Sequence, residues 1–428
     1  MQAMKSRPLR LVALLAALLL LAGACGRDDE GGGDTGGGAQ TDGEVKTGPG
    51  FDGTTIKLGV ITPLSGPVAP VFGIPITAGN QVYFDKVNAA GGVAGKYKVE
   101  LVKEDNVYDA AQTKPKYDKI KGDVAMFGQI LGTPPTQAVL ADLKRDGIVA
   151  SPASLDAAWV REPNLLPIGS TYQIQFINAA DYLINDKGFK GKPICMVAVE
   201  GEYGDAGIQG LEFAAKELKF DIAVTARYKP TDQDFTAQIQ QLKNGKCAAV
   251  FLTALPTQTA QIIGGAAQQG LTPQWVGQSP TWAGALATSP VAPVLQKTFL
   301  WASEGATWGD QSVVGMKEML ADIAKYKADQ QPDVYFVFGY VQAIAVHALL
   351  EQAVENGDLS RAGILKAVED VSVDYKGLLG EYKYGQPADR DPSRETTLFT
   401  VDPSVPGALK KLVSVSSDAA KKLTFEAS

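Results

Sequence analysis

The strongest constraint on the fold is a twofold alternation of short apolar strands with helical patterns, which begins at Thr54. A first series of β-branched or apolar runs lies at residues 56–61, 99–102, 124–127 and 148–150. A second series begins after Pro167, with runs at residues 194–199, 222–226, 248–253 and 274–277. Strands that alternate with helices form right-handed crossovers and parallel sheets. The pattern therefore predicts an α/β protein with two doubly wound lobes in tandem.

The first 25 residues carry an export signal. Basic residues precede an apolar run at residues 11–22 that is too short to span a bilayer. Small residues before Cys25 form a lipobox, although Ala22 stands where leucine is usual. We expect a signal peptide over residues 1–24 and a lipid anchor on Cys25, which would hold the mature chain at the extracytoplasmic face of the cell membrane. The alternative is an ordinary secretory signal in which Cys25 is incidental.

Residues 25–53 are rich in glycine and acidic residues and nearly free of apolar side chains. Such a segment buries too little surface to offset its ordering entropy, so the composition predicts a flexible tether. About 375 residues follow from Thr54 onward. That length suits two domains better than one compact core.

The composition excludes several functions. A formal net charge of −7 argues against a nucleic-acid partner, which requires a basic face. His347 is the only histidine, so a two-histidine metal site is excluded, and its apolar helical surroundings favour a structural role. The enzyme alternative is an exported hydrolase, but the sequence has no G-x-S-x-G nucleophile motif. We expect no enzyme, and no catalytic residue, metal or cofactor.

Cys195 and Cys247 remain once Cys25 is lipidated, and disulfides persist in exported proteins. Each cysteine lies at the start of a strand of the second series, and the two strands are neighbours in a 2-1-3 parallel order. A disulfide and a pair of buried thiols both fit this pattern.

Several motifs resemble the family of periplasmic branched-chain amino-acid-binding proteins. They are the runs at residues 61–69 and 88–95, Pro135-Thr136-Gln137, Ser151-Pro152-Ala153 and Glu202-Tyr203-Gly204. The resemblance implies a monomeric type I solute-binding protein with two Rossmann-like lobes, which closes on a small ligand and delivers it to the permease subunits of an ABC importer. A sensory receptor that reports to a kinase or chemoreceptor would share the same body, so it stays as the alternative.

The resemblance also implies three crossings between the lobes, near residues 167–171, 301–305 and 377–384. We expect residues 54–168 and 304–378 in the first lobe, and residues 169–303 and 379–428 in the second. The two long helical patterns at residues 313–327 and 334–356 should then pack on the first lobe.

In open parallel sheets, ligands lie beyond the carboxyl ends of the strands. Thr133 reads as the N-cap of a helix, whose N–H groups favour an anion, so we expect a ligand carboxylate at Thr133 and at the backbone of Ala153 and Ser154. By the resemblance, Phe72 and Tyr203 are aromatic walls of the site, although ordinary packing explains either residue alone.

Departures from the family pattern bear on the ligand. Leu255 replaces a tyrosine, Tyr172 stands where an aspartate contact is expected, and Gln278-Ser279 replace the glutamate that pairs with the ligand ammonium. A buried unpaired ammonium costs several kcal/mol, so these changes favour a carboxylate, amide or aromatic acid over an α-amino acid. Glu200 and Glu202 are the nearest alternative acids. The predicted contacts are Phe72, Thr133, Ala153, Ser154, Tyr172, Tyr203, Gln278 and Ser279.

Overall fold

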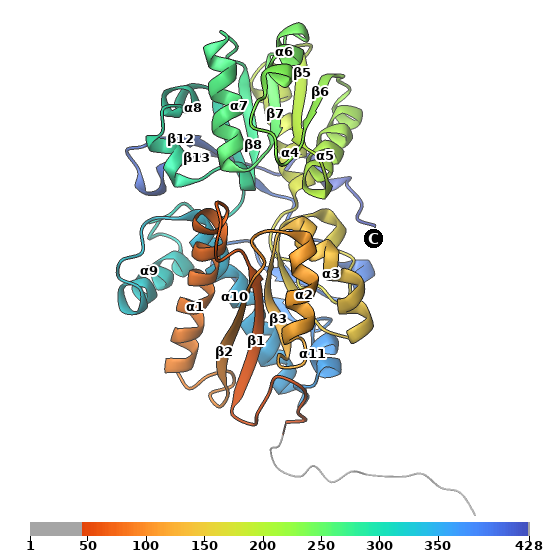
Figure 1. The fold of residues 1–428 in the computed structure, drawn as a ribbon, viewed down its shortest axis with the longest axis vertical. Helices are drawn as coiled ribbons and strands as arrows, with labels where there is room; N and C mark the ends of the chain where they lie inside the picture. The colour runs from red at the N-terminus through yellow and green to blue at the C-terminus, as the bar shows by residue number, and fades with distance from the viewer. Residues whose placement is uncertain (1–44, 427–428) are drawn as a thin grey trace, which may run out of the picture. The chain divides into compact units, whose positions relative to one another are not determined.

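The computed structural model describes residues 45–426, so the predicted signal peptide and Cys25 lie outside the described residues (Figure 1). Its first sheet has four parallel strands in the order β2-β1-β3-β4. The strands are β1 (Thr55–Thr62), β2 (Lys98–Asp105), β3 (Met126–Leu131) and β4 (Ala150–Ala153). The helices that connect them are α1 (Ile74–Ala89), α2 (Ala110–Ile120) and α3 (Thr133–Asp146).

The second sheet has seven strands in the order β13-β12-β9-β8-β7-β5-β6. Its parallel strands are β5 (Ile194–Val199), β6 (Ile222–Tyr228), β7 (Ala249–Thr253), β8 (Gln274–Gln278) and β9 (Phe299–Ser303). Its helices are α4 (Tyr172–Asp181), α5 (Glu202–Leu218), α6 (Thr236–Asn244), α7 (Pro256–Gln268) and α8 (Ala292–Thr298). The predicted α/β fold is confirmed. An antiparallel edge is added by β12 (Thr396–Val401) and β13 (Leu409–Val415), with a short helix, α12 (Asp418–Lys421), after it.

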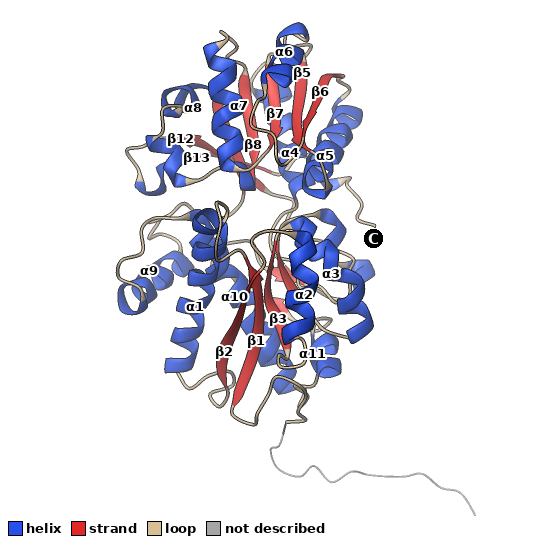
Figure 2. Cartoon of the chain, in the orientation of Figure 1, coloured by secondary structure: helices blue, strands red, loops and turns tan. Residues whose placement is uncertain are grey.

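Between β9 and β12 in the sequence come α9 (Val314–Tyr326), α10 (Val334–Glu355) and α11 (Arg361–Ala367). The short hairpin of β10 (Ser372–Val373) and β11 (Tyr382–Lys383) follows them. Helix α10 packs on α1 and on strands β3 and β4 of the first sheet. Helices α2 and α3 pack on each other and on strands of the same sheet (Figure 2). By length and composition α10 could cross a membrane, but 61% of its apolar window is buried inside the protein. That burial is typical of a core helix.

Glycines allow α1 and α10 to cross closely. A Cβ atom on Gly79 would lie 2.2 Å from the carbonyl oxygen of Phe336, and one on Gly339 would lie 1.9 Å from that of Ile76. No side chain fits there, so the two backbones touch. This contact fixes the start of α10, which borders the candidate site.

The predicted tether is wrong at its end, because residues 46–53 dock on the first lobe. Backbone hydrogen bonds join Lys46 to Gly357 and Leu359, and Phe51 packs edge-on against the ring of Tyr97 at 5.0 Å. The packing of Phe51 and these hydrogen bonds offset the conformational entropy that the segment loses when it is ordered. The glycine-rich composition does not reveal these contacts.

Cys195 and Cys247 form a disulfide with their Cα atoms 5.8 Å apart. Residue Cys195 pairs in register with Val250 on the neighbouring strand β7, which begins two residues after Cys247. The bond therefore closes a sequence separation of 52 residues across two adjacent strands of the second sheet.

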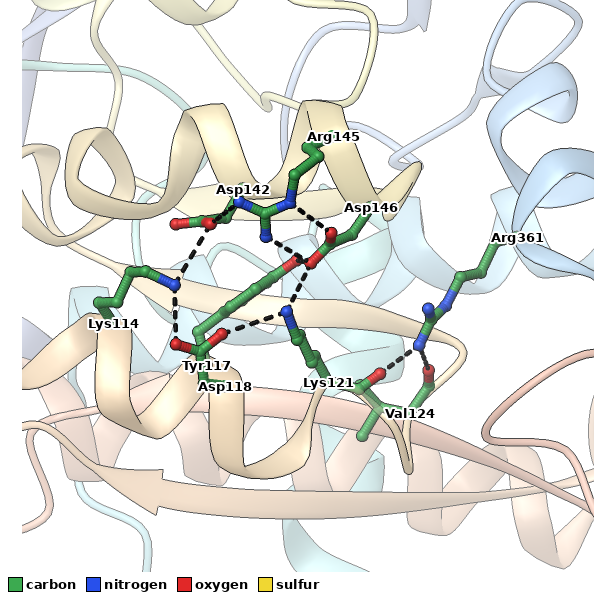
Figure 3. A network of polar contacts seen from close by, with 9 residues as sticks. All are labelled: Lys114, Tyr117, Asp118, Lys121, Val124, Asp142, Arg145, Asp146 and Arg361. Carbon is green, nitrogen blue, oxygen red and sulfur yellow. Dashed lines mark hydrogen bonds and ion pairs between the residues drawn. The ribbon is translucent and has the colours of Figure 1, made fainter.

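Helices α2 and α3 are joined by a network of charged side chains (Figure 3). Lys114 pairs with Asp118 and Asp142, and Lys121 pairs with Asp118 and Asp146. The Arg145 guanidinium and the Lys121 ammonium hold the pKa of Asp146 below its usual range. Most of these groups are partly exposed, so the ion pairs add little to the free energy of unfolding. They orient α2 and α3 relative to each other.

Candidate ligand-binding site

A cavity lies at the carboxyl ends of the first sheet's strands and is closed by residues of the second. Its volume of about 110 Å³ is several times the space that one water molecule needs. The first sheet contributes Leu131, Gly132, Thr133, Ala153, Ser154 and Leu155. The second contributes Tyr203, Leu255, Ser279, Pro280, Trp301 and Ser303. One face of α10 lines it with Val334, Tyr335, Val337, Phe338 and Val341.

The start of α3 differs from the sequence prediction. Gly132, with φ of 102°, is the N-cap, and Thr133 is the first helical residue. A Cβ atom on Gly132 would lie 2.7 Å from the ring of Tyr108, so only glycine fits. Because Thr133 caps no N–H group, its hydroxyl is buried without a hydrogen-bond partner among the described residues. Thr133 is one of the residues that line the cavity.

Prolines limit what the α3 N-terminus offers to an anion. Pro134 and Pro135 carry no N–H, and the N–H of Gly132 donates to the carbonyl oxygen of Ala153. The N–H of Thr136 donates to Gly132 in the first helical turn. At the start of α3, Thr133 is therefore the residue that can contact an anion, because few backbone N–H groups there are free. Anion binding by the helix terminus alone is weaker here than the sequence prediction assumed.

Two aromatic pairs form walls of the cavity. Phe72 packs against Tyr335 with ring centroids 4.5 Å apart, and Tyr172 packs against Tyr203 at 5.2 Å. Tyr335 was not predicted as a site residue. Its position follows from Asp333, which caps α10 by accepting hydrogen bonds from the N–H groups of Tyr335 and Phe336. An aspartate before a long apolar helix is a sequence signal for that cap, but it does not indicate that Tyr335 lines a cavity.

Seven of the eight predicted contact residues line the cavity, and Gln278 does not. The side chain of Gln278 lies under α5, where a Cβ atom on Gly207 would come within 3.0 Å of its Oε1. Alternate residues of a strand point to opposite faces, so Ser279 takes the place at the cavity instead. Whether the seven contact a ligand stays a prediction.

The acid at this site is Glu304, which the sequence prediction missed. Neither Glu200 nor Glu202 lines the cavity. Among the lining residues described, Glu304 alone has a carboxyl, ammonium, guanidinium or imidazole side chain. Burial raises its pKa to about 8, and a hydrogen bond from the Ser170 N–H offsets that rise only in part. The one signal in the sequence is an acid directly after the apolar strand at residues 299–303.

The sequence matches the family model described as "Periplasmic binding protein" over residues 55–406. A Leu/Ile/Val-binding protein of Rhizobium johnstonii is 27% identical over 204 residues, which cover 46% of this chain but only 53%, about half, of that protein. A Leu/Ile/Val-binding protein homologue of Brucella melitensis is 24% identical over 345 residues, which cover 78% of this chain and 87% of that protein.

Among solved structures, a fatty acid ABC transporter substrate-binding protein from Thermomonospora curvata superposes with a TM-score of 0.83. It is 30% identical in sequence, and the match covers 90% of this chain and 98% of that chain. Two α/β lobes around a cavity at the strand ends define a solute-binding class of protein. The chain belongs to the periplasmic binding protein family, and its fold is the type I fold of that family's solved structures.

Proposed function

We propose that this protein is the substrate-binding component of an ABC importer, which captures a small ligand and delivers it to the permease subunits. The observation that carries the proposal is the cavity at the strand ends, enclosed by side chains from both sheets. A ligand held there by both lobes favours the closed arrangement of the lobes. Delivery of a bound ligand by a closed binding protein needs no chemical step, which agrees with a cavity lined mainly by hydroxyl, aromatic and aliphatic groups, with one carboxyl, that of Glu304, among the described residues.

We infer that the ligand is a monocarboxylic acid or amide with an apolar chain. Aliphatic and aromatic side chains dominate the cavity, and the face of α10 from Val334 to Val341 extends it by roughly 10 Å at 1.5 Å per residue. The polar residues that line the cavity include Thr133, Tyr172 and Glu304. The similarity to a protein described as a fatty acid ABC transporter substrate-binding protein supports this ligand class.

The location of the protein is part of the same proposal. A lipid on Cys25 would tether the domain to the extracytoplasmic face of the membrane, beside a permease. A substrate-binding protein held near its permease meets it at high effective concentration.

A thermal-shift screen tests the proposal. Sodium octanoate, benzoate, hexanamide, leucine and valine are each added to the purified domain, and the melting temperature is recorded. A ligand at a hundredfold excess over its Kd stabilises the folded state by about 2.7 kcal/mol. We expect octanoate to raise the melting temperature and leucine and valine to leave it unchanged. No shift with any acid or amide would reject the ligand class.

The site is checked with Thr133→Val, which removes the unpaired hydroxyl at nearly constant volume. Thr257 offers a matched control. Like Thr133 it lies in the first turn of a helix, but it is exposed and outside the cavity. Thr133→Val should reduce the octanoate shift, and Thr257→Val should not. Uptake of labelled octanoate by cells with and without the protein then tests delivery to a permease.

A further inference from the structure

Glu304 is held at the junction of two chain segments that lead from one sheet to the other. Its Oε2 accepts a hydrogen bond from the N–H of Ser170 at 2.5 Å. Its Oε1 lies where a side chain of Gly169 would begin, only 1.6 Å from an ideal Cβ atom, and Gly169 has φ of +72°. The position of the carboxyl is therefore fixed by a glycine that leaves room for it.

One oxygen of this carboxyl is uncommitted. Within the described part of the chain, Oε2 bonds to Ser170 and Oε1 has no hydrogen-bond partner. Protein atoms surround the carboxyl, yet the residue keeps some accessible surface because it borders the cavity. An oxygen without a partner beside an apolar cavity is a group to which a ligand atom can bond.

The surroundings of Glu304 favour its uncharged form. Among the described residues that line the cavity there is no lysine, arginine or histidine, and the groups nearest to it are neutral. The Ser170 N–H is its one donor, and the phenol of Tyr375 is close enough that the Glu304 charge raises the pKa of that phenol. An ionised carboxylate in such a place is poorly compensated.

We propose that Glu304 is a specificity-determining residue that donates a hydrogen bond, as a neutral carboxylic acid, from its free oxygen to a carboxylate oxygen of the ligand. This inference rests on the proposed function, because it assigns the head group of the same ligand. The ligand carboxylate and Glu304 then share one proton, and the pair carries a single negative charge. A hydrogen bond from a neutral acid to a carboxylate is short and strong compared with one between neutral groups.

Two consequences follow for selectivity and pH. A carboxylate ligand gains an O–H donor here, and an amide gains the same donor for its carbonyl oxygen with less charge assistance. Because the pKa of Glu304 is about 8, carboxylate affinity should be constant below pH 8 and fall about tenfold per pH unit above it. Below pH 8 the donor is present, and above pH 8 two negative charges face each other.

The test measures the Kd of octanoate by calorimetry between pH 6 and 9.5 for the whole domain and three variants. Glu304→Gln keeps an acceptor for the Ser170 N–H and offers an N–H₂ donor that does not titrate. We expect its affinity at pH 7 within about threefold of the unmodified protein, without the fall above pH 8. Glu304→Leu removes the donor to a charged group, so we expect a loss of about 10- to 100-fold.

Glu381 supplies the control, because it is an exposed glutamate outside the cavity. Glu381→Gln should leave the Kd and its pH profile unchanged. The melting temperature of each variant without ligand separates a folding defect in Glu304→Leu from a loss of binding, and Glu304→Gln carries the pH result if that variant is unstable.

Three outcomes overturn the inference. They are an unmodified protein whose affinity does not change up to pH 9.5, a Glu304→Leu variant that binds octanoate as the unmodified protein does, and leucine binding that Glu304→Gln abolishes. The last would make Glu304 the partner of a ligand ammonium. If the unmodified protein binds no acid or amide at all, the proposed function fails, and this inference falls with it. Failure of the proposed function is distinguishable from failure of this inference alone, because it is seen with the unmodified protein before any variant is made.

Discussion

The hydroxyl of Tyr335 donates a hydrogen bond to the carbonyl oxygen of Ser279, with 3.0 Å between the two oxygens. The carbonyl oxygen of Trp282 is a second acceptor within reach, so the two oxygens share the single proton of this hydroxyl. Tyr335 lies in the first turn of α10, which packs on the first sheet, and Ser279 directly follows β8 of the second. This hydroxyl therefore links the two halves of the cavity wall.

Tyr335→Phe should weaken ligand binding. The ring and its packing on Phe72 remain, but the proton that the carbonyl oxygens of Ser279 and Trp282 share is lost. At about 0.5–1.5 kcal/mol for one neutral hydrogen bond, we expect the Kd of octanoate to rise by roughly two- to twelvefold. Tyr326→Phe, at the end of α9 and outside the cavity, serves as the control. Equal affinities for the two variants would show that the Tyr335 hydroxyl does not contribute to closure.

Gly169→Ala should displace Glu304. The new Cβ atom would lie 1.6 Å from Glu304 Oε1, so the carboxyl must move and lose the Ser170 hydrogen bond. Positive φ adds a cost of about 1–2 kcal/mol for any residue with a side chain. Gly188→Ala isolates that backbone cost, because Gly188 has φ of +70° and no atom within 4 Å of its ideal Cβ.

The comparison of the two alanine variants is made by urea unfolding and by octanoate titration. Gly169→Ala should lose more stability than Gly188→Ala and should bind octanoate more weakly. If the two lose equal stability and both keep full affinity, the carboxyl of Glu304 is not held in place by Gly169.

Removal of the disulfide should destabilise the second lobe. The bond between Cys195 and Cys247 closes a separation of 52 residues, which in the chain-entropy account corresponds to about 4 kcal/mol. We expect the double variant Cys195→Ala, Cys247→Ala to lose about 2–4 kcal/mol, measured by urea unfolding. Reduction of the unmodified protein with dithiothreitol should reproduce the loss. A reductant without effect on the unmodified protein would indicate that the thiols are not bonded.

Lipid attachment is tested by Cys25→Ser. Serine has no thiol for the thioether bond, so we expect an uncleaved precursor or a soluble product in place of the membrane-bound protein. Fractionation of cells and metabolic labelling with palmitate measure the two outcomes. Normal processing and membrane retention of the variant would contradict the lipobox interpretation.

Local patterns predicted four parallel strands in each sheet, β1 to β4 and β5 to β8, but not β9 or β13 of the second sheet. Strand periodicity at residues 56–61 and 194–199 marks β1 and β5, and parallel strands bring their following loops together by topology alone. Residues at those strand ends, such as Ala153 and Ser279, were therefore predictable as cavity residues.

The remaining site residues depend on contacts between distant segments. Glu304 and Tyr335 reach the cavity because one crossing and the start of α10 return to it, and no local pattern encodes that return. Thr133 was misread as a cap because serine and threonine caps are common, whereas the close approach of Tyr108 requires Gly132 at that place. The docking of Phe51 likewise depends on a partner, Tyr97, that composition does not show.

Glu304 also predicts how the stability of the unliganded protein depends on pH. Burial raises its pKa from 4.5 to about 8, so the folded state keeps a proton that the unfolded chain releases above pH 4.5. The stability contributed by the protonated form is complete below pH 4.5 and is lost as the pH rises to about 8, by at most about 1.4 kcal/mol per pH unit. Glu304→Gln does not titrate, so its unfolding free energy relative to that of the unmodified protein should increase between pH 5 and pH 8. Urea unfolding at pH 5, 6.5 and 8 measures the difference, with Glu381→Gln, an exposed position outside the cavity, measured beside it. A constant difference for Glu304→Gln would mean that Glu304 is ionised in the folded protein at neutral pH, and a carboxylate ligand would then meet repulsion at this position instead of a donor.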